Sequence, residues 1–271
     1  MLQNFIAEGL RGKSKETIKT YKHAIEQFEI WLDGAGTNLQ EYSRTDIQLY
    51  INYLVSNGKS AATINKIWNA LKKYSLFVSK SECIEDISVI KPPSIFNTAP
   101  KSLSRNEANS LVRQIDRSNN IRDLAICLVL LNCGVRLSEL VFLDKRDAVI
   151  SDRKGEIKVR YGKGNKERIV PLNSETRRAI TKYLETRPDN NPALFLSNRG
   201  DRISGRAVQH IFNKYDVNVH SLRHTFITRL VRNNEDFSLI QSLSGHSSAD
   251  MVIRYSAPTE DDKIAAVNKL W

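Results

Sequence analysis

The amino-acid sequence predicts a mainly α-helical protein with a small antiparallel β element, divided into two domains. Apolar residues recur at three- and four-residue steps through much of the chain, which is the period of an amphipathic helix. Two short β-like runs, IKVRY at 157–161 and RIVPL at 168–172, are joined by GKGNKE, as in a hairpin with a glycine-containing turn. A proline-rich segment near residue 90 separates the domains. We therefore expect an all-helical N-terminal domain followed by a mixed α+β domain.

The N-terminal domain, residues 1–89, should contain three helices. The first begins at Ser14, after about 13 residues outside any helix, the second near Thr45, and the third runs from Ser60 to Phe77. Their aromatic side chains fall on the apolar stripes, so we expect them in the core rather than stacked on nucleic-acid bases. The stripe of the first helix consists of Ile18, Tyr21, Ala24, Ile25, Phe28, Trp31 and Leu32.

A linker is predicted at 90–101, because IKPPSIFNTAP has three prolines and no periodicity. The second domain, 102–271, opens with Ser104 and Glu107 in a capping-box arrangement. A helix over about 120–133 should stop at Gly134, and the hairpin follows it. Further helices are expected at about 174–186, 204–214, 221–233, 236–243 and 259–269.

The charge of the chain favours a polyanionic partner. The net charge is +11 over 271 residues, and residues 1–90 hold 11 basic and 10 acidic side chains, which leaves 30 basic and 20 acidic for the rest. A basic excess concentrated in one domain points to nucleic acid. The longest apolar run, AICLVLL at 125–131, is too short to span a membrane.

The three cysteines suggest a reducing compartment. Cys127 and Cys133 lie in or beside the apolar run, and Cys83 is the third. An odd number of cysteines, two of them in an apolar segment, indicates buried free thiols. The N-terminus carries Glu8 and lacks a sustained apolar stretch, unlike a signal peptide. We expect a cytoplasmic protein with no membrane partner.

The stretch HSLRHTF at 220–226 places His220, Arg223 and His224 on one helical face, which fits either a metal site or a phosphate site. A zinc-protease helix has a glutamate where this chain has Ser221, and a divalent cation beside Arg223 is unfavourable. With a phosphate the electrostatic interaction with Arg223 becomes favourable. Arg223 can donate a bidentate pair of hydrogen bonds to the phosphate, and His220 can reach the same group. We expect an anion site, with a half-buried helix of no function as the other alternative.

Two further stretches bear on the same chemistry. NCGVRLSEL places Arg136 just after a helix-breaking glycine and three residues before Glu139, which in isolation is an ordinary ion pair. LSGHSSADMVIRYS places His246 at an expected helix end and Tyr255 nine residues later, which in isolation is a packing residue. None of these motifs is specific alone.

Together the order R…K…HxxR…H…Y resembles the tyrosine recombinase (phage integrase) family. The matching pieces are GVRLSEL, GKGNKERIVPL, HSLRHTF, SGHSS and RYS. The resemblance covers almost the whole chain, and it implies a SAM-like core-binding domain ahead of a tyrosine-recombinase catalytic domain. With so few residues before the first expected helix, we expect no arm-binding domain, so the layout resembles Xer-like recombinases. Ser244 departs from the leucine common in the family.

The resemblance implies a site-specific DNA recombinase that cuts and rejoins strands through a 3′-phosphotyrosyl intermediate, without metal or ATP. Its partner would be double-stranded DNA carrying a specific recombination site, on which the chain would form a homotetramer across paired sites. Whether a paralogous recombinase or accessory proteins also take part is left open. His224 is expected to support the helix or a neighbouring strand. The implied catalytic residues are Arg136, Lys163, His220, Arg223, His246 and the nucleophile Tyr255, with Glu139 orienting Arg136.

Individual roles follow from the same resemblance. Arg136 and Arg223 would stabilise charge on the phosphoryl group, and His246 would donate to one of its oxygens. His220 would accept the proton of Tyr255 or bind phosphate. Lys163, or alternatively Lys166, would protonate the leaving 5′ oxygen.

Three other readings remain open from the sequence. A type IB topoisomerase-like enzyme uses a related residue set, a DNA-binding accessory protein could share the fold, and a zinc hydrolase lacks a recognisable third ligand. The DNA target and the biological role, whether integration, excision, transposon resolution or chromosome dimer resolution, cannot be deduced from the residues.

Overall fold

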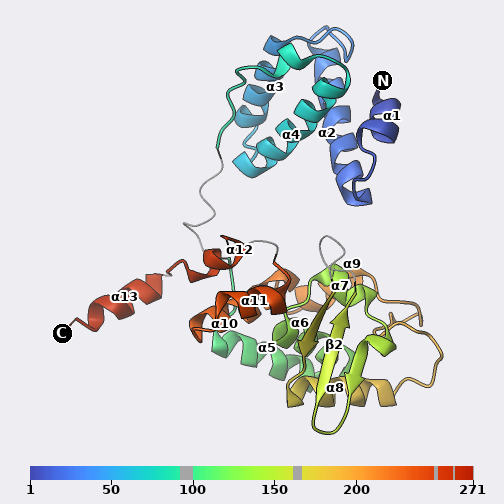
Figure 1. Ribbon diagram of the computed structural model, residues 1–271, viewed down its shortest axis with the longest axis vertical. Helices are drawn as coiled ribbons and strands as arrows, with labels where there is room; N and C mark the ends of the chain where they lie inside the picture. Colours follow the sequence, from blue (N-terminus) through green and yellow to red (C-terminus); the bar gives the residue numbers. More distant parts are fainter. Residues whose placement is uncertain (92–99, 161–166, 247–249, 259, 271) are drawn as a thin grey trace. The chain divides into compact units, whose positions relative to one another are not determined.

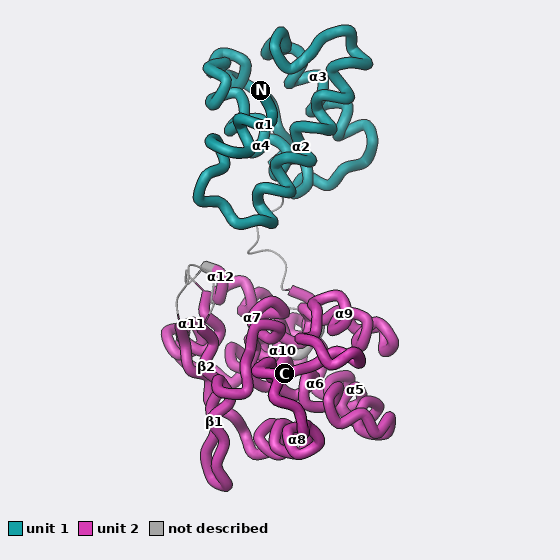
Figure 2. Tube along the Cα trace, turned by 90° about the vertical axis from the view of Figure 1, so that its right-hand side faces the viewer, with its two compact units in different colours: residues 1–93 teal, residues 94–271 magenta. Residues whose placement is uncertain are grey.

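A computed structural model describes residues 1–91, 100–160, 167–246, 250–258 and 260–270. The chain divides into two compact units, Met1–Pro93 and Ser94–Trp271 (Figure 2). Most of the linker predicted at 90–101 falls on residues 92–99, outside the described residues.

The N-terminal unit is all-helical, as predicted. Its three main helices begin one residue after a serine whose hydroxyl accepts a hydrogen bond from a backbone N–H of the first turn, which satisfies a donor that the helix leaves unpaired. These N-cap residues are Ser14, Ser43 and Ser60. The main helices are α2 (Lys15–Gly34), α3 (Arg44–Ser56) and α4 (Ala61–Phe77), and a 3-10 turn follows at Ser81–Ile84.

Aromatic residues form much of the core of this unit. Phe28 and Tyr74 are fully buried, and Phe28 packs against Tyr42 edge-to-face with ring centroids 5.5 Å apart. The Tyr42 hydroxyl pairs with Ser75 Oγ at 2.9 Å, so its one polar atom is satisfied inside the core. Phe28 and Tyr74 are packing residues, as the helical stripes predicted, and Tyr42 joins them from the loop before α3.

The expectation of about 13 non-helical residues at the start of the chain is wrong. Helix α1 (Leu2–Asn4) continues into a π-helical turn at Phe5–Gly9. Phe5 and Leu10 are fully buried, and the Phe5 ring meets Tyr74 edge-to-face at 5.2 Å. Burial of these side chains on the three-helix core stabilises a segment too short to form a helix alone.

The second unit is mixed, with helices around a small sheet (Figure 1). Its longest apolar helix, α6, is buried on nearly every face, and Cys127 and Cys133 lie in this core as free thiols, as predicted. Burial raises the pKa of both thiols to about 12. The helices are α5 (Arg105–Arg117), α6 (Ile121–Cys133), α7 (Leu137–Phe142), α8 (Ser174–Glu185), α9 (Gly205–Asn213), α10 (Val219–Arg232), α11 (Phe237–Ser244), α12 (Asp250–Ile253) and α13 (Glu260–Asn268), with 3-10 turns at Lys145–Asp147 and Arg254–Ser256.

The sheet contains the predicted hairpin and one additional strand. β2 (Gly155–Val159) pairs antiparallel with β3 (Arg168–Pro171), with Ile157 opposite Val170. β1 (Ala148–Ile150), which has only three residues and no clear alternation, pairs with the other edge of β2 and was not predicted. The turn residues 161–166 lie outside the described residues.

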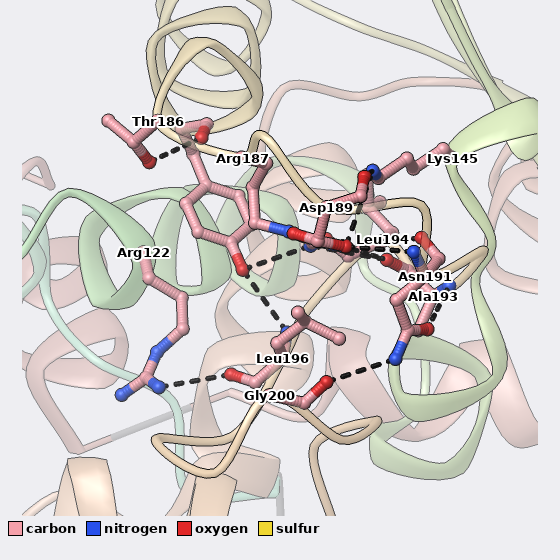
Figure 3. Close-up of polar contacts among 11 residues, drawn as sticks. Arg122, Lys145, Thr186, Arg187, Asp189, Asn191, Ala193, Leu194, Leu196 and Gly200 are labelled. Atoms are coloured by element: carbon pink, nitrogen blue, oxygen red, sulfur yellow. Dashed lines mark hydrogen bonds and ion pairs between the residues drawn. The ribbon is translucent and has the colours of Figure 1, made fainter.

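The long connection from α8 to α9 is held by polar contacts instead of regular structure (Figure 3). The Arg187 guanidinium donates to both carboxylate oxygens of Asp189 and to the Leu194 carbonyl. The Asn191 side-chain amide donates to the Gly200 carbonyl at 3.0 Å. These contacts fix a connection that leads into α9.

No helix in the described ranges combines the length and the apolar character needed to cross a membrane.

Candidate active site

Helix α10 carries the HSLRHTF stretch and presents it to a cavity of about 650 Å³. The helix begins after Asn218, whose side chain accepts from the His220 backbone N–H at 2.9 Å. His220 is exposed, whereas Arg223 is 7% exposed. The cavity is lined by residues from α7, α10 and the segment that follows α11, among them Arg136, His220, Arg223, His224, His246, Arg254 and Tyr255. The structure thus brings the predicted residues of the described ranges together.

The elements that carry these residues lie on one side of the unit. Figures 1 and 2 both show α7, α11 and α12 away from α8, on the opposite side of the unit. Helix α10 contacts both α11 and the 3-10 turn that carries Tyr255. Residues more than a hundred positions apart in sequence therefore meet in one cavity.

Arg136 is held by Glu139, as predicted, and by a backbone carbonyl. Its Nη1 donates to Glu139 Oε1 at 2.7 Å, and its Nη2 donates to the Gly245 carbonyl at 2.8 Å. The second Glu139 oxygen accepts from the Arg136 backbone N–H, at the start of α7. These bonds fix the guanidinium at the wall of the cavity.

Arg168, which was not predicted, is the second arginine bound to Glu139. Its Nη1 and Nη2 donate to the two Glu139 oxygens at 3.0 and 2.7 Å, and its Nε donates to the Leu243 carbonyl. Burial alone would raise the pKa of Glu139, but the hydrogen bonds and charge of Arg168, together with Arg136, lower it to about 2. A signal was present in RIVPL, because period-two alternation puts Arg168 on the same face as the buried Val170.

Arg223 is buried against backbone carbonyls. It donates to the Gly134 carbonyl and, at 2.7 Å, to the Ser244 carbonyl. Burial, followed by the charge of Arg136, lowers the pKa of Arg223 to about 10. The group therefore remains a cation at neutral pH, fixed between the end of α6 and the end of α11.

His246 accepts a hydrogen bond from Arg223 in this structure. Its Nε2 lies 3.2 Å from Arg223 Nη2, and a guanidinium can only donate. The Nδ1, 3.1 Å from Ser244 Oγ, then carries the proton of a neutral ring. Burial, with the charges of Arg223 and Arg136, lowers the pKa of His246 to about 4, which agrees with this tautomer. The predicted donation from His246 to a phosphoryl oxygen requires the ring to gain a proton or to turn.

Tyr255 is 6% exposed and lies in the 3-10 turn Arg254–Ser256, beside the buried Ile227, Ile240 and Val252. Its hydroxyl lies 2.8 Å from His224 Nδ1. Burial raises the pKa of Tyr255, so the phenol is protonated at neutral pH. The pattern predicts a supporting role for His224, whereas the structure puts this ring in contact with the predicted nucleophile.

Lys163 and its alternative Lys166 lie outside the described residues. Among the described residues no cluster of three or more histidine, cysteine or carboxylate side chains could hold a metal ion. The described residues that line the cavity include three arginines and three histidines but no carboxylate. Such a lining favours an anionic group.

Comparisons with known proteins identify the family of this chain. Residues 101–261 match the model of the phage integrase family, and residues 2–80 match that of the phage integrase N-terminal SAM-like domain. The chain is 33% identical to tyrosine recombinase XerA of Pyrococcus horikoshii, over 96% of this chain and 89% of the relative. It is 32% identical to tyrosine recombinase XerC of Thermodesulfovibrio yellowstonii, over 88% and 84%.

Solved structures share the fold. The crystal structure of XerA recombinase is 27% identical, with a TM-score of 0.55 over 99% of this chain and 97% of that one. XerH bound to a palindromic difH substrate has a TM-score of 0.77 at 21% identity, over 98% and 83%. A lambda integrase tetramer bound to a Holliday junction has a TM-score of 0.73 at 18% identity, over 94% and 74%. With two family models covering most of the sequence, the chain belongs to the phage integrase family and is a tyrosine-type site-specific recombinase.

Proposed function

We propose that this recombinase cuts and rejoins DNA strands through a 3′-phosphotyrosyl intermediate on Tyr255. The observation that carries the proposal is the cavity, where the Tyr255 hydroxyl lies among arginines and histidines. The hydroxyl attacks phosphorus and the 5′ oxygen leaves. The 5′-hydroxyl of another strand then attacks the intermediate and releases the tyrosine. Covalent catalysis divides one difficult exchange into two similar steps.

Arg136 and Arg223 stabilise the negative charge that builds on the phosphoryl oxygens. Each is already fixed by hydrogen bonds to a carboxylate or to backbone carbonyls, so little reorganisation is needed when DNA binds. Loss of one such prepositioned donor typically costs about 10²–10³ in rate. His220 and His246 are the remaining proposed phosphate ligands.

Lys163, between β2 and β3, is the proposed acid that protonates the leaving 5′ oxygen, with Lys166 as the alternative. This assignment rests on the family resemblance, since both lysines lie outside the described residues. The lysine and the two arginines together would supply the positive charge that Mg²⁺ supplies to other phosphoryl-transfer enzymes. We therefore propose that the reaction requires neither a metal nor ATP, because the phosphodiester energy is kept in the tyrosyl bond.

The proposed partners are duplex DNA with a specific site and further copies of this chain. Two relatives of the same fold support this, because one is bound to its difH substrate and another is a tetramer on a Holliday junction. The basic excess of residues 91–271 agrees with binding to a polyanion. A homotetramer on paired sites would supply the several active sites that strand exchange needs.

Covalent capture on nicked DNA tests the proposed chemistry. A nick next to the scissile phosphate makes the fragment that leaves with the free 5′-hydroxyl very short, so this fragment diffuses away. The protein–DNA adduct then accumulates. A library of nicked duplexes with a randomised central segment supplies the substrate, and sequencing of the captured DNA identifies the site. We expect an adduct with the wild-type protein and none with Tyr255→Phe, in the presence or absence of EDTA.

The controls separate the alternatives. Tyr215→Phe removes a hydroxyl from a tyrosine outside the cavity and should leave the adduct unchanged. An adduct that persists in Tyr255→Phe would move the nucleophile to another residue, and loss of the adduct with EDTA would show that a metal is required. Relaxation of supercoiled DNA lacking the captured site would favour the topoisomerase-like alternative.

A further inference from the structure

The contact between His224 and Tyr255 identifies a candidate proton acceptor that the sequence pattern did not. On the basis of the proposed function, we propose that His224, not His220, accepts the proton of the Tyr255 hydroxyl as that oxygen attacks phosphorus. His224 Nδ1 lies 2.8 Å from Tyr255 Oη, and the two ring centroids are 5.7 Å apart. A general base must lie within hydrogen-bond reach of the proton it removes, and His224 meets that requirement.

Both side chains are held by packing. Helix α10 contacts the 3-10 turn that carries Tyr255, and the tyrosine is buried beside Ile227, one turn of α10 away from His224. The neighbouring Phe226 packs on the same cluster. The hydrogen bond therefore joins two elements that pack against each other.

The position of His220 is different. It lines the same cavity one turn earlier, but its side chain is exposed. Within the described ranges its backbone N–H bonds to Asn218, and no side-chain hydrogen bond joins it to Tyr255. His220 is thus placed to meet a phosphoryl oxygen that enters the cavity.

The protonation states suit a transfer from Tyr255 to His224. Burial, followed by the charges of His220, Arg223 and Arg254, lowers the pKa of His224 to about 4, so the free imidazole is neutral. Since Tyr255 is a protonated phenol, its O–H donates and Nδ1 accepts. The ring of His246, also neutral, lies with its centroid 6.0 Å from that of Tyr255. A bound phosphodiester adds a negative charge to this cluster, which raises the basicity of His224 when it is needed.

The step balances as follows. The Tyr255 O–H bond breaks and its proton moves to Nδ1, which gives an imidazolium. The oxygen keeps the electron pair and forms the O–P bond. The P–O5′ bond breaks with its electron pair on the 5′ oxygen, which takes a proton from the general acid of the proposed function. In the reverse attack, His224 returns its proton to the departing tyrosine oxygen.

The pH dependence of single-turnover adduct formation tests this role. With wild type, the rate should change little with pH across the neutral range, because the lowered pKa of His224 leaves its imidazole neutral and able to accept the proton throughout. With His224→Ala the phenol must lose its proton to hydroxide, so the rate should fall by about 10²–10⁴ at neutral pH and rise by about tenfold per pH unit. Free imidazole should restore part of the lost rate.

Matched variants keep the test independent of folding. His224→Asn can still hydrogen-bond to Tyr255 but cannot take its proton, so it should fold like wild type and show the same loss and the same pH slope. His220→Ala should lower the rate of adduct formation by the same factor at every pH, and free imidazole should not restore it. A pH profile of His224→Asn parallel to wild type, with no response to imidazole, would overturn the proposal. Tyr255→Phe is measured alongside, because an adduct there defeats the proposed function itself.

Discussion

At the scale of single residues, one buried carboxylate organises the site. Glu139 is 3% exposed and accepts from Arg136 and Arg168, which come from α7 and β3. A buried carboxylate is tolerated only when its charge is paired and its oxygens are hydrogen-bonded. Arg168 also bonds to the Leu243 carbonyl, just before the turn that carries His246. We therefore predict that Arg168 is a positioning residue that acts through Glu139 and this turn.

We predict that Arg168→Met destabilises the catalytic unit by about 3–5 kcal/mol, because it removes a partner from a buried charge. Urea unfolding measures this loss. Adding Glu139→Gln should cost less than the sum of the two single changes, since both disrupt one network. The control is Lys158→Met, which breaks the exposed Lys158–Glu167 pair on the neighbouring strand and should change stability by less than about 1 kcal/mol. Equal effects of the two changes would contradict a central role for Arg168.

At the scale of elements, the end of α6 determines where two arginines lie. Gly134 ends the helix, as predicted, in the left-handed region with φ of +58°. A Cβ at this position would lie 2.1 Å from the Phe226 ring of α10. The Gly134 carbonyl accepts from Arg223, and Arg136 follows two residues later. The turn thus packs α6 on α10 and fixes both cations.

Gly134→Ala should destabilise the protein by about 2–5 kcal/mol, through the cost of a positive φ and through overpacking against Phe226. The midpoint temperature of thermal unfolding and the yield of the protein–DNA adduct should both fall. Gly200→Ala is the matched control, because its φ is +83° but nothing lies within 4 Å of the added Cβ. Its cost should be limited to about 1–2 kcal/mol. A Gly134→Ala protein as stable as the control would show that α10 yields easily at Phe226.

At the scale of the whole molecule, each of the two units has its own hydrophobic core. One is built on the aromatic residues of the N-terminal unit and the other on α6. The described residues that line the candidate active-site cavity all belong to the second unit. Most of the net positive charge also lies in that part of the sequence. Helix α13 exposes two apolar side chains, since Ile264 and Val267 are 59% and 58% exposed.

We predict that deletion of residues 259–271 leaves adduct formation on a single site intact but prevents assembly on paired sites. The exposed apolar residues of α13 fit a contact with another copy of this chain, where burial would stabilise them. Gel-shift and sedimentation experiments on paired-site DNA measure the assembly. The double variant Ile264→Ser, Val267→Ser should reproduce the defect without shortening the chain. Full synapsis by the deletion variant would exclude this contact.

Much of the fold could be predicted because its signals are local. The apolar stripes, the serine caps and Gly134 each act within a few residues, so the main helices and the hairpin were predicted and are confirmed. The helical segment at residues 2–9 and the strand β1 were missed. Both are short and depend on burial against distant residues, which local propensity does not report.

The sequence by itself determined the family, because the types and the order of its motif residues can be recognised without a fold. It also supplied the residue types on which the proposed chemistry depends, which are arginine and histidine side chains for a phosphate and a tyrosine as the nucleophile. Only the tertiary structure decided which groups meet. It put His224 on the Tyr255 hydroxyl, joined Arg168 to Glu139, and made His246 an acceptor from Arg223. These are contacts between α7, α10, β3 and the segment after α11. Helical or strand periodicity fixes a residue's face but not its partner across the fold.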